Sequence, residues 1–218
     1  MIKKVYTIFI ILREVYYGEY KSCQQNKDLH RKADKGTVFV TIDFVHIAEK
    51  SRIGVIFSRL EADGLIRRIL QGVYYKPEYN DFLGEFVAPE PDAVAHALAR
   101  NFSWTIVPCG DTALNRLGLS TQIPAAWVYV SDGTYKEYTY KQTTIKFKRT
   151  TNKEISKLSY KTALVVQALK ALGKENVDDA VLTKLKNNLA DSEKQALLSE
   201  AKTVTSWIYE YIKQICRS

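Results

Sequence analysis

The chain has 218 residues, which is enough for one or two domains with modest hydrophobic cores. Its hydrophobic content of 46% and charged content of 26% are those of an ordinary globular protein and exclude a disordered chain. The net charge of +8 favours an acidic partner, and most of the excess lies in residues 1–76, with 14 Lys and Arg against 8 Asp and Glu.

The N-terminal segment begins with a short apolar run, Val5 to Leu12, after Lys3 and Lys4. This run resembles the start of a signal peptide, but no small-residue cleavage site follows, and it is too short to span a bilayer. We therefore predict a helical extension over residues 1–36 and no contact with a membrane.

The next segment predicts a strand followed by two short helices. Thr37–Val40 is β-rich, and Thr41 is expected to cap the first helix. Ser51 is expected to cap the second helix, over residues 52–62, which ends at Gly64. The apolar residues of this second helix recur at i, i+3, i+4 and i+7, as in an amphipathic helix: Ile53, Ile56, Phe57 and Leu60.

A hairpin pattern follows directly. The β-rich runs Ile66–Leu70 and Val73–Tyr75 flank a two-residue turn at Gln71-Gly72, and Pro77 then ends the domain. Two helices followed by a hairpin predict a winged helix-turn-helix domain over residues 37–80. Such a domain places one helix in the major groove of DNA and its hairpin, the wing, near the backbone. The first hypothesis is therefore binding of double-stranded DNA.

The candidate DNA contacts lie on the second helix, at its start and on the wing. Ser and Arg side chains can bind base edges or phosphates, a Val can touch a thymine methyl, and cations beside the wing suit phosphates. Alternatively these arginines are merely solvated, and Arg59 and Arg67 form ion pairs within the domain. The candidates are Thr41, Ser51, Arg52, Val55, Ser58, Arg59, Arg67, Arg68, Gln71 and Lys76.

The rest of the chain predicts a mixed α/β C-terminal domain over residues 81–218 that ends in a helical bundle, so that the whole fold is α+β. Residues 78–91 are interpreted as a connection. Asn176 and Asp191 are expected to cap two of the late helices. Helices are expected over 93–101, 111–117 and 159–172 and towards the C-terminus, and strands over 103–107, 126–130, 137–140 and 144–147.

No catalytic, cofactor or metal motif stands out. Cys109 precedes a helix, where a thiol pKa can be lowered, but a small buried residue at a tight turn is the favoured interpretation. The acidic residues between Glu78 and Asp92 lack paired spacing and are expected to be solvated. The three cysteines are scattered, as in a cytoplasmic protein with reduced thiols. The segment Leu117–Pro124 is either a structured loop or a contact surface for a partner.

Several segments, in order, make the chain similar to the AbiEi-type antitoxin family, the regulators of type IV (abortive-infection) toxin–antitoxin operons. The resemblance covers about residues 37 to 215. It is carried by Ser58–Arg68, Gly72–Pro77, Ile106–Asn115, Leu117–Pro124, Tyr129–Gly133, Ile145–Lys148, Leu158–Gly173 and Ala201–Tyr209.

The resemblance implies a non-enzymatic antitoxin whose winged helix binds operator DNA and represses its own operon. It also implies a C-terminal domain that counteracts an AbiEii-like nucleotidyltransferase toxin, with no stable complex between the two. The chain departs from the family at Gly54, Val55, Leu70 and Gln71, where relatives usually carry more basic residues or Gly-Arg. Fewer cations there imply weaker DNA contacts or a different sequence preference.

Two other hypotheses remain open. In one, the winged helix is a protein-interaction module that forms a direct complex with a partner protein. In the other, the chain is a nucleic-acid enzyme with a site near Cys109 or the acidic segment 78–92.

Overall fold

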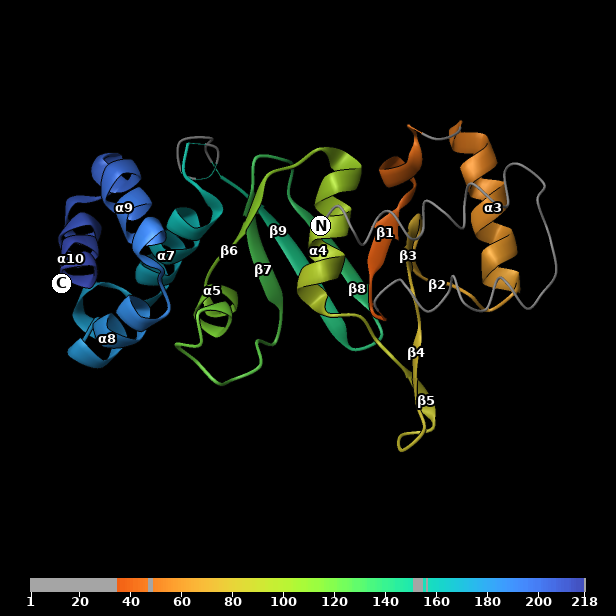
Figure 1. Cartoon of the computed structure of the whole chain (residues 1–218), viewed down its shortest axis with the longest axis horizontal. Coiled ribbons are helices and arrows are strands. Elements are labelled where there is room, and N and C mark those ends of the chain that lie inside the picture. The colour runs from red at the N-terminus through yellow and green to blue at the C-terminus, as the bar shows by residue number, and fades with distance from the viewer. Residues whose placement is uncertain (1–34, 47–48, 151–154, 156, 218) are drawn as a thin grey trace. The chain divides into compact units, whose positions relative to one another are not determined.

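A computed structural model of the chain describes residues 35–46, 49–150, 155 and 157–217. These residues form an α+β fold in two compact units, one that ends at Ser103 and one that begins at Trp104 (Figure 1). The predicted extension over residues 1–36 lies outside the described residues except for its last two positions. Across the described ranges, none of the helices combines the length and apolar character that a membrane crossing requires.

The first unit is built on a three-stranded antiparallel sheet of order β1-β3-β2. The hairpin turn at Gln71-Gly72 is confirmed, and Gly72 has a φ of 73°, which a glycine adopts without strain. The elements of the unit are β1 (Val38–Val40), η1 (Thr41–Phe44), α3 (Lys50–Ala62), β2 (Arg67–Leu70), β3 (Val73–Tyr75), β4 (Glu78–Asn80), β5 (Glu85–Val87) and α4 (Pro91–Phe102).

An aromatic cluster holds α3 on one face of this sheet. The ring of Phe57 makes edge-on contacts with Phe39 of β1, Phe44 of η1 and Tyr74 of β3, at centroid distances of 5.4, 5.6 and 4.9 Å. The predicted apolar stripe of the helix is confirmed, since Ile53, Ile56, Phe57 and Leu60 are all buried.

The two ends of α3 differ in how well they were predicted. The helix begins at Lys50, one residue before Ser51, and its N-cap, Glu49, makes no side-chain capping bond. Ser51 therefore lies within the first turn and does not cap the helix. Gly64 ends the helix as predicted: with a φ of 70° it allows its own N–H to reach the Glu61 carbonyl at 3.0 Å and that of Leu65 to reach the Leu60 carbonyl at 2.9 Å.

The first short helix is the 3-10 helix η1, and Thr41 is its first residue rather than its cap. The N-cap position belongs to Val40, whose backbone N–H donates to the Asp43 carboxylate at 3.0 Å. The side chain that accepts a hydrogen bond at the start of this helix is therefore that of Asp43, two residues after Thr41. The sequence pattern did not reveal this.

Helix α4 covers the other face of the sheet (Figure 1). Its buried residues include Val94 and Leu98. The Arg100 guanidinium binds both oxygens of the Asp43 carboxylate, at 2.8 and 3.0 Å, and the Val38 carbonyl at 3.3 Å. These contacts attach α4 to the first unit, so the structure divides after Ser103 and not after residue 80, where the sequence placed the domain boundary.

The interpretation of residues 78–91 as a simple connection is wrong. Strands β4 and β5 pair antiparallel, with Tyr79 opposite Phe86, and form a separate two-stranded sheet. Figure 1 shows this hairpin extending away from the three-stranded sheet. We call residues 78–87 the arm.

The second unit contains a four-stranded sheet of order β6-β7-β9-β8, in which β7 and β9 run parallel and the other neighbours antiparallel. Its elements are β6 (Ile106–Pro108), α5 (Asp111–Arg116), β7 (Trp127–Ser131), β8 (Lys136–Tyr140), β9 (Thr143–Arg149), α7 (Tyr160–Leu172), η2 (Lys174–Asn176), α8 (Asp179–Asn187), α9 (Asp191–Glu200), η3 (Ala201–Thr203) and α10 (Ser206–Cys216).

Helix α7 is the centre of the second core. Every residue from 162 to 169 is buried, and the helix contacts β6, α5, α9 and α10. The expected succession of a mixed α/β region and packed helices is therefore confirmed, but two caps are not. Asp178 rather than Asn176 caps α8, accepting from the Val181 N–H at 2.8 Å. At α9 the residue before Asp191 is the N-cap, and its N–H donates to the Glu193 carboxylate.

We expect Phe57→Ala to lower the free energy of unfolding of the first unit by about 3–5 kcal/mol, because it removes a ring with three aromatic neighbours and leaves a cavity. Hydrogen exchange of the α3 amides measures this change. Val55→Ala, on the same helix at an exposed position, is the matched control and should change it by less than about 0.5 kcal/mol. Equal effects of the two variants would contradict the described packing.

Candidate nucleic-acid interface

The side of α3 that faces away from the sheet is small and uncharged. Four exposed residues recur there at i, i+4, i+7 and i+11, opposite the buried stripe: Ser51, Val55, Ser58 and Ala62. Gly54 lies next to them, and a side chain there would meet nothing within 4 Å. A flat helix face of this kind allows the backbone of a ligand to come close.

Two of the three cations of α3, Arg52 and Arg59, lie to one side of this small-residue stripe, whereas Lys50 at the start of the helix lies on the other side. Arg52 and Arg59 are exposed and seven residues apart, about two helical turns, so they share one flank of the helix. The Ser58 hydroxyl already donates to the Gly54 carbonyl at 3.0 Å, which occupies the proton that a phosphate contact needs. The polar contacts that α3 can offer a polyanion therefore come mainly from its arginine flank.

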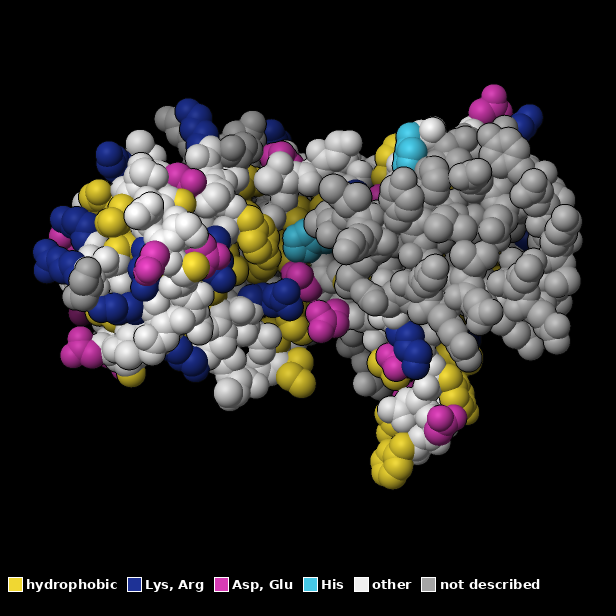
Figure 2. All heavy atoms as spheres, viewed as in Figure 1, with side chains coloured by type: hydrophobic (Ala, Val, Ile, Leu, Met, Phe, Trp, Pro, Cys, Tyr) yellow, Lys and Arg dark blue, Asp and Glu magenta, His cyan; other side chains and the backbone are white. Residues whose placement is uncertain are grey.

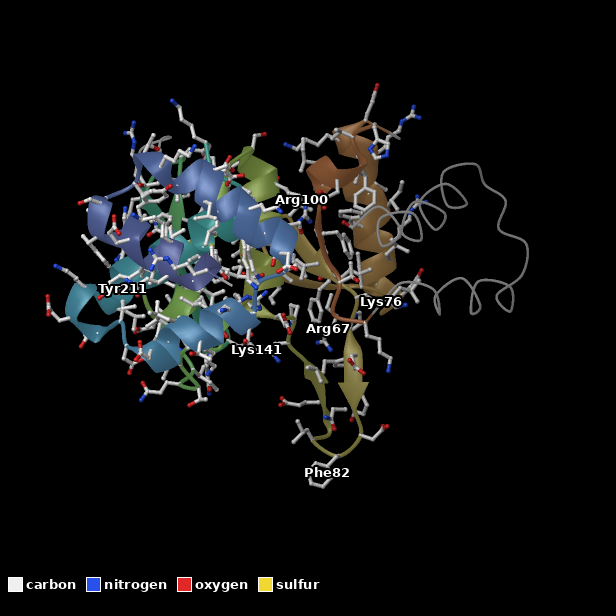
Figure 3. All side chains as sticks on the ribbon, turned by 60° about the vertical axis from the view of Figure 1, so that its left-hand side comes forward. Arg67, Lys76, Phe82, Arg100, Lys141 and Tyr211 are labelled. Atoms are coloured by element: carbon white, nitrogen blue, oxygen red, sulfur yellow. The ribbon has the colours of Figure 1, made fainter. Side chains whose placement is uncertain are left out.

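The two arginines of β2 face opposite sides of the sheet. Arg68 is paired with Tyr74, whose ring packs on Phe57 of α3, so Arg68 is on the α3 side. Arg67 is paired with Tyr75 and faces the other way. Its guanidinium lies 4.1 Å from the centre of the Phe86 ring of the arm, and Figure 3 shows it near the base of the arm.

The alternative that Arg67 forms an ion pair is thus replaced by a cation–π contact with Phe86, which is worth about 0.5–1 kcal/mol at an exposed site. This contact ties the arm to β2. Of the two arginines of β2, only Arg68 is placed to act together with the exposed side of α3.

The remaining predicted contacts are spread over the unit. Gln71 is exposed at the hairpin turn, whereas Lys76 follows the other end of β3, about 10–15 Å of strand away. The Lys76 backbone N–H donates to the Thr37 carbonyl at 3.0 Å, and the residue is half-buried. Thr41 is also half-buried, in η1. The structure therefore groups the α3 residues, but it does not bring Lys76 to the turn of the β2–β3 hairpin.

The arm is an exposed feature that sequence reasoning missed. Phe82 is 95% exposed at its tip, next to Leu83 at 60%, and Figure 3 shows Phe82 at the far end of the hairpin. The signal was present, since aromatic residues at positions 79 and 86 flank a segment that contains the turn residues Asn80, Asp81 and Gly84.

Cys109 is buried at the turn from β6 to α5, and its backbone N–H donates to the Val128 carbonyl at 2.9 Å. Burial raises the pKa of its thiol, and the nearby positive charge of Lys148 and a backbone hydrogen bond to Val130 offset this only in part. A raised pKa leaves less thiolate at neutral pH, so the geometry favours a structural role over that of a nucleophile.

The acidic segment 78–92 does not assemble into a metal site. Glu78 is 3.1 Å from the Lys35 ammonium, and Asp92 is 3.6 Å from the His96 ring. Within the described part of the chain, no group of three or more His, Cys, Asp or Glu side chains is arranged to hold a metal ion.

In a Cys23→Ser, Cys216→Ser background, we expect Cys109 to react with iodoacetamide more slowly than free cysteine at pH 7. The rate should still be rising above the pH at which an ordinary thiol has ionised, because the pKa of Cys109 is raised. Mass spectrometry of the alkylated chain measures both rates, and unfolding in urea, as the control, should remove the difference. Rapid alkylation of the folded chain at pH 7 would revive the nucleophile hypothesis.

No curated protein matches the chain. The model of DUF6088, described as a family of unknown function, matches residues 25–197, a range that includes most of both described units. Because this match covers well over half of the sequence, the chain belongs to the DUF6088 family.

Proposed function

We propose that the chain is the antitoxin of a type IV toxin–antitoxin system. In this proposal the first unit is a winged helix that binds operator DNA and represses its own operon. The second unit counteracts a nucleotidyltransferase-like toxin without forming a stable complex with it, and the protein acts in the cytoplasm and is not an enzyme.

The observation that carries the proposal is the placement of α3 between η1 and the β2–β3 hairpin. The Phe57 cluster fixes the rotation of α3, so that the small residues around Val55 point away from the sheet. Strand, short helix, exposed helix and hairpin follow one another in the order expected of a winged helix. This order supports α3 as the helix that enters the major groove.

Within this proposal each contact has a distinct role. Val55 is suited to a thymine methyl, since it is 53% exposed at the centre of the outward stripe. Arg52 and Arg59 on the flank of α3 are suited to phosphates, and Arg68 adds a third cation from the wing. With few cations, the affinity should depend on each of them, and it should fall with salt in proportion to the small number of phosphates that they contact.

The antitoxin role of the second unit rests on the family resemblance. The segment Leu158–Gly173, which carries part of that resemblance, largely coincides with α7, the buried centre of the core. Buried core residues of this kind account for a fold that is shared with the family. The loop Leu117–Pro124, in contrast, has exposed positions and belongs to the part of the unit that can meet other molecules.

One observation favours the alternative of a protein-interaction module that forms a direct complex. The exposed apolar tip of the arm, Phe82 and Leu83, is of a kind that often marks a protein–protein contact. A stable stoichiometric complex with a partner protein in the absence of DNA would favour this alternative.

We expect Arg68→Ala to weaken binding to the DNA upstream of the protein's own gene by about 3–10-fold and to reduce the salt slope by about one. Arg67→Ala is the matched control, because the neighbouring arginine faces the other side of the sheet and should have a smaller effect. Fluorescence anisotropy at several salt concentrations measures both. Binding that ignores salt, or no binding to this DNA, would count against the winged-helix proposal.

A second test separates repression from antitoxin activity in cells. Arg52→Ala, Arg59→Ala and Arg68→Ala combined should raise the activity of the protein's own promoter, because three proposed phosphate contacts are lost. The same variant should still protect cells from a toxin encoded by a neighbouring nucleotidyltransferase gene. Promoter fusions and growth assays measure the two effects, and a simultaneous loss of both in a folded variant would contradict the division of roles between the units.

A further inference from the structure

The arm combines an apolar tip with acidic flanks. Phe82 and Leu83 are exposed at the tip, and the arm carries three acidic residues and no Lys or Arg: Glu78, Asp81 and Glu85. Figure 2 shows hydrophobic and acidic side chains together at the free end of the hairpin. The whole chain has a net charge of +8, but the arm carries an excess of negative charge around its exposed Phe.

The arm is held in shape before any partner arrives. The rings of Tyr79 and Phe86 make an edge-on contact at 5.1 Å across its two strands. The Asn80 side-chain oxygen accepts from the backbone N–H groups of Phe82 and Leu83, at 3.0 and 3.1 Å, which fixes the turn at the tip. Since Arg67 also stacks on Phe86, the backbone of the arm is already ordered, and the entropy lost on binding is mainly that of the tip side chains.

The negative charge of the arm indicates which class of partner can bind it. DNA and anionic lipid surfaces both repel the carboxylates of Asp81 and Glu85, whereas Glu78 at the base of the arm is paired with Lys35. A fitting partner instead offers an exposed apolar side chain flanked by positive charge.

The second unit carries such a surface, which we call the Ile123 loop, residues 118–125. Ile123 is 83% exposed. The loop is held by hydrogen bonds from the Asn115 side chain to the Gln122 carbonyl at 3.0 Å and from the Gln122 N–H to the Ser120 hydroxyl at 3.2 Å. It therefore presents Ile123 on an ordered support, as the arm presents Phe82.

Two exposed cations lie beside the Ile123 loop. Arg116 is exposed directly before it, and the Lys184 side chain of α8 lies against Gly118. No acidic residue occurs between Asp111 and Asp132. The loop thus has the apolar centre and cationic flanks that the arm requires.

We propose that the arm of one molecule docks on the Ile123 loop of a second copy of this chain. Phe82 and Leu83 pack against Ile123 at the centre of the contact. The carboxylates of Asp81 and Glu85 face the cations Arg116 and Lys184 at its rim. The chain therefore self-associates through two different surfaces, and this inference is independent of the proposed antitoxin function.

Sedimentation velocity of the full chain over a range of concentrations tests the proposal, with a charge-swap design. The wild type should form dimers or larger assemblies whose dissociation constant rises with salt. Asp81→Lys with Glu85→Lys should weaken association at least tenfold, and so should Arg116→Glu with Lys184→Glu. All four substitutions together should restore it, because each like-charge contact is replaced by an opposite-charge one.

The matched control is Glu175→Lys with Asp191→Lys, which changes the net charge equally at exposed positions outside both surfaces and should leave association unchanged. Phe82→Ser should weaken association at high as well as low salt. A chain that stays monomeric throughout, or a four-substitution variant that stays as weak as the two pairs, overturns the proposal. Asp81→Lys with Glu85→Lys tightening DNA binding while sedimentation is unchanged would overturn it in favour of DNA as the occupant.

Discussion

The contact of the Phe57 ring with three other aromatic rings is the constraint on which the first unit depends. It joins a helix, a 3-10 helix and two strands of one sheet at a single side chain. Because neighbouring residues of a helix are turned by about 100°, the burial of Phe57 also decides which residues of α3 face outward. The outward position of Val55 therefore follows from the packing of Phe57, two positions away. The proposed contact of Val55 with a DNA base depends on the same packing.

A second contact secures the other side of the same sheet. Arg100 and Asp43 are 57 residues apart in sequence, and the Asp43 side chain is largely removed from solvent. Asp43 accepts from the Val40 N–H as well, so its lone pairs are shared between a helix start and a distant arginine. A carboxylate placed in this way is tolerated because its charge is compensated, and the loss of Arg100 would leave it buried without its cation.

Some local features of this fold could be predicted from the sequence, whereas the N-terminal helix caps and the long-range contacts could not. The stripe from Ile53 to Leu60, Gly64 and the turn at Gly72 were confirmed because each depends on neighbours within a few residues. The prediction of Asn176 as a cap was wrong because α8 begins only at Asp179, so that Asp178 accepts from the Val181 N–H. The Asn176 side chain instead donates to the Leu172 carbonyl at the end of α7. Arg67 and Arg68 point to opposite faces because side chains alternate along a strand, but which of them faces α3 depends on strand register, which the sequence pattern does not reveal.

The sheet order of the second unit has a consequence for the order of events during synthesis. Strand β9 lies between β7 and β8, although it is the last of the four strands in the chain. One edge of β7 therefore remains open until Thr143–Arg149 has left the ribosome, whereas the three-stranded sheet of the first unit is complete once Tyr75 has been made. A ribosome that pauses between these points holds a chain with one closed sheet and one exposed strand edge, and such an edge can pair with other chains.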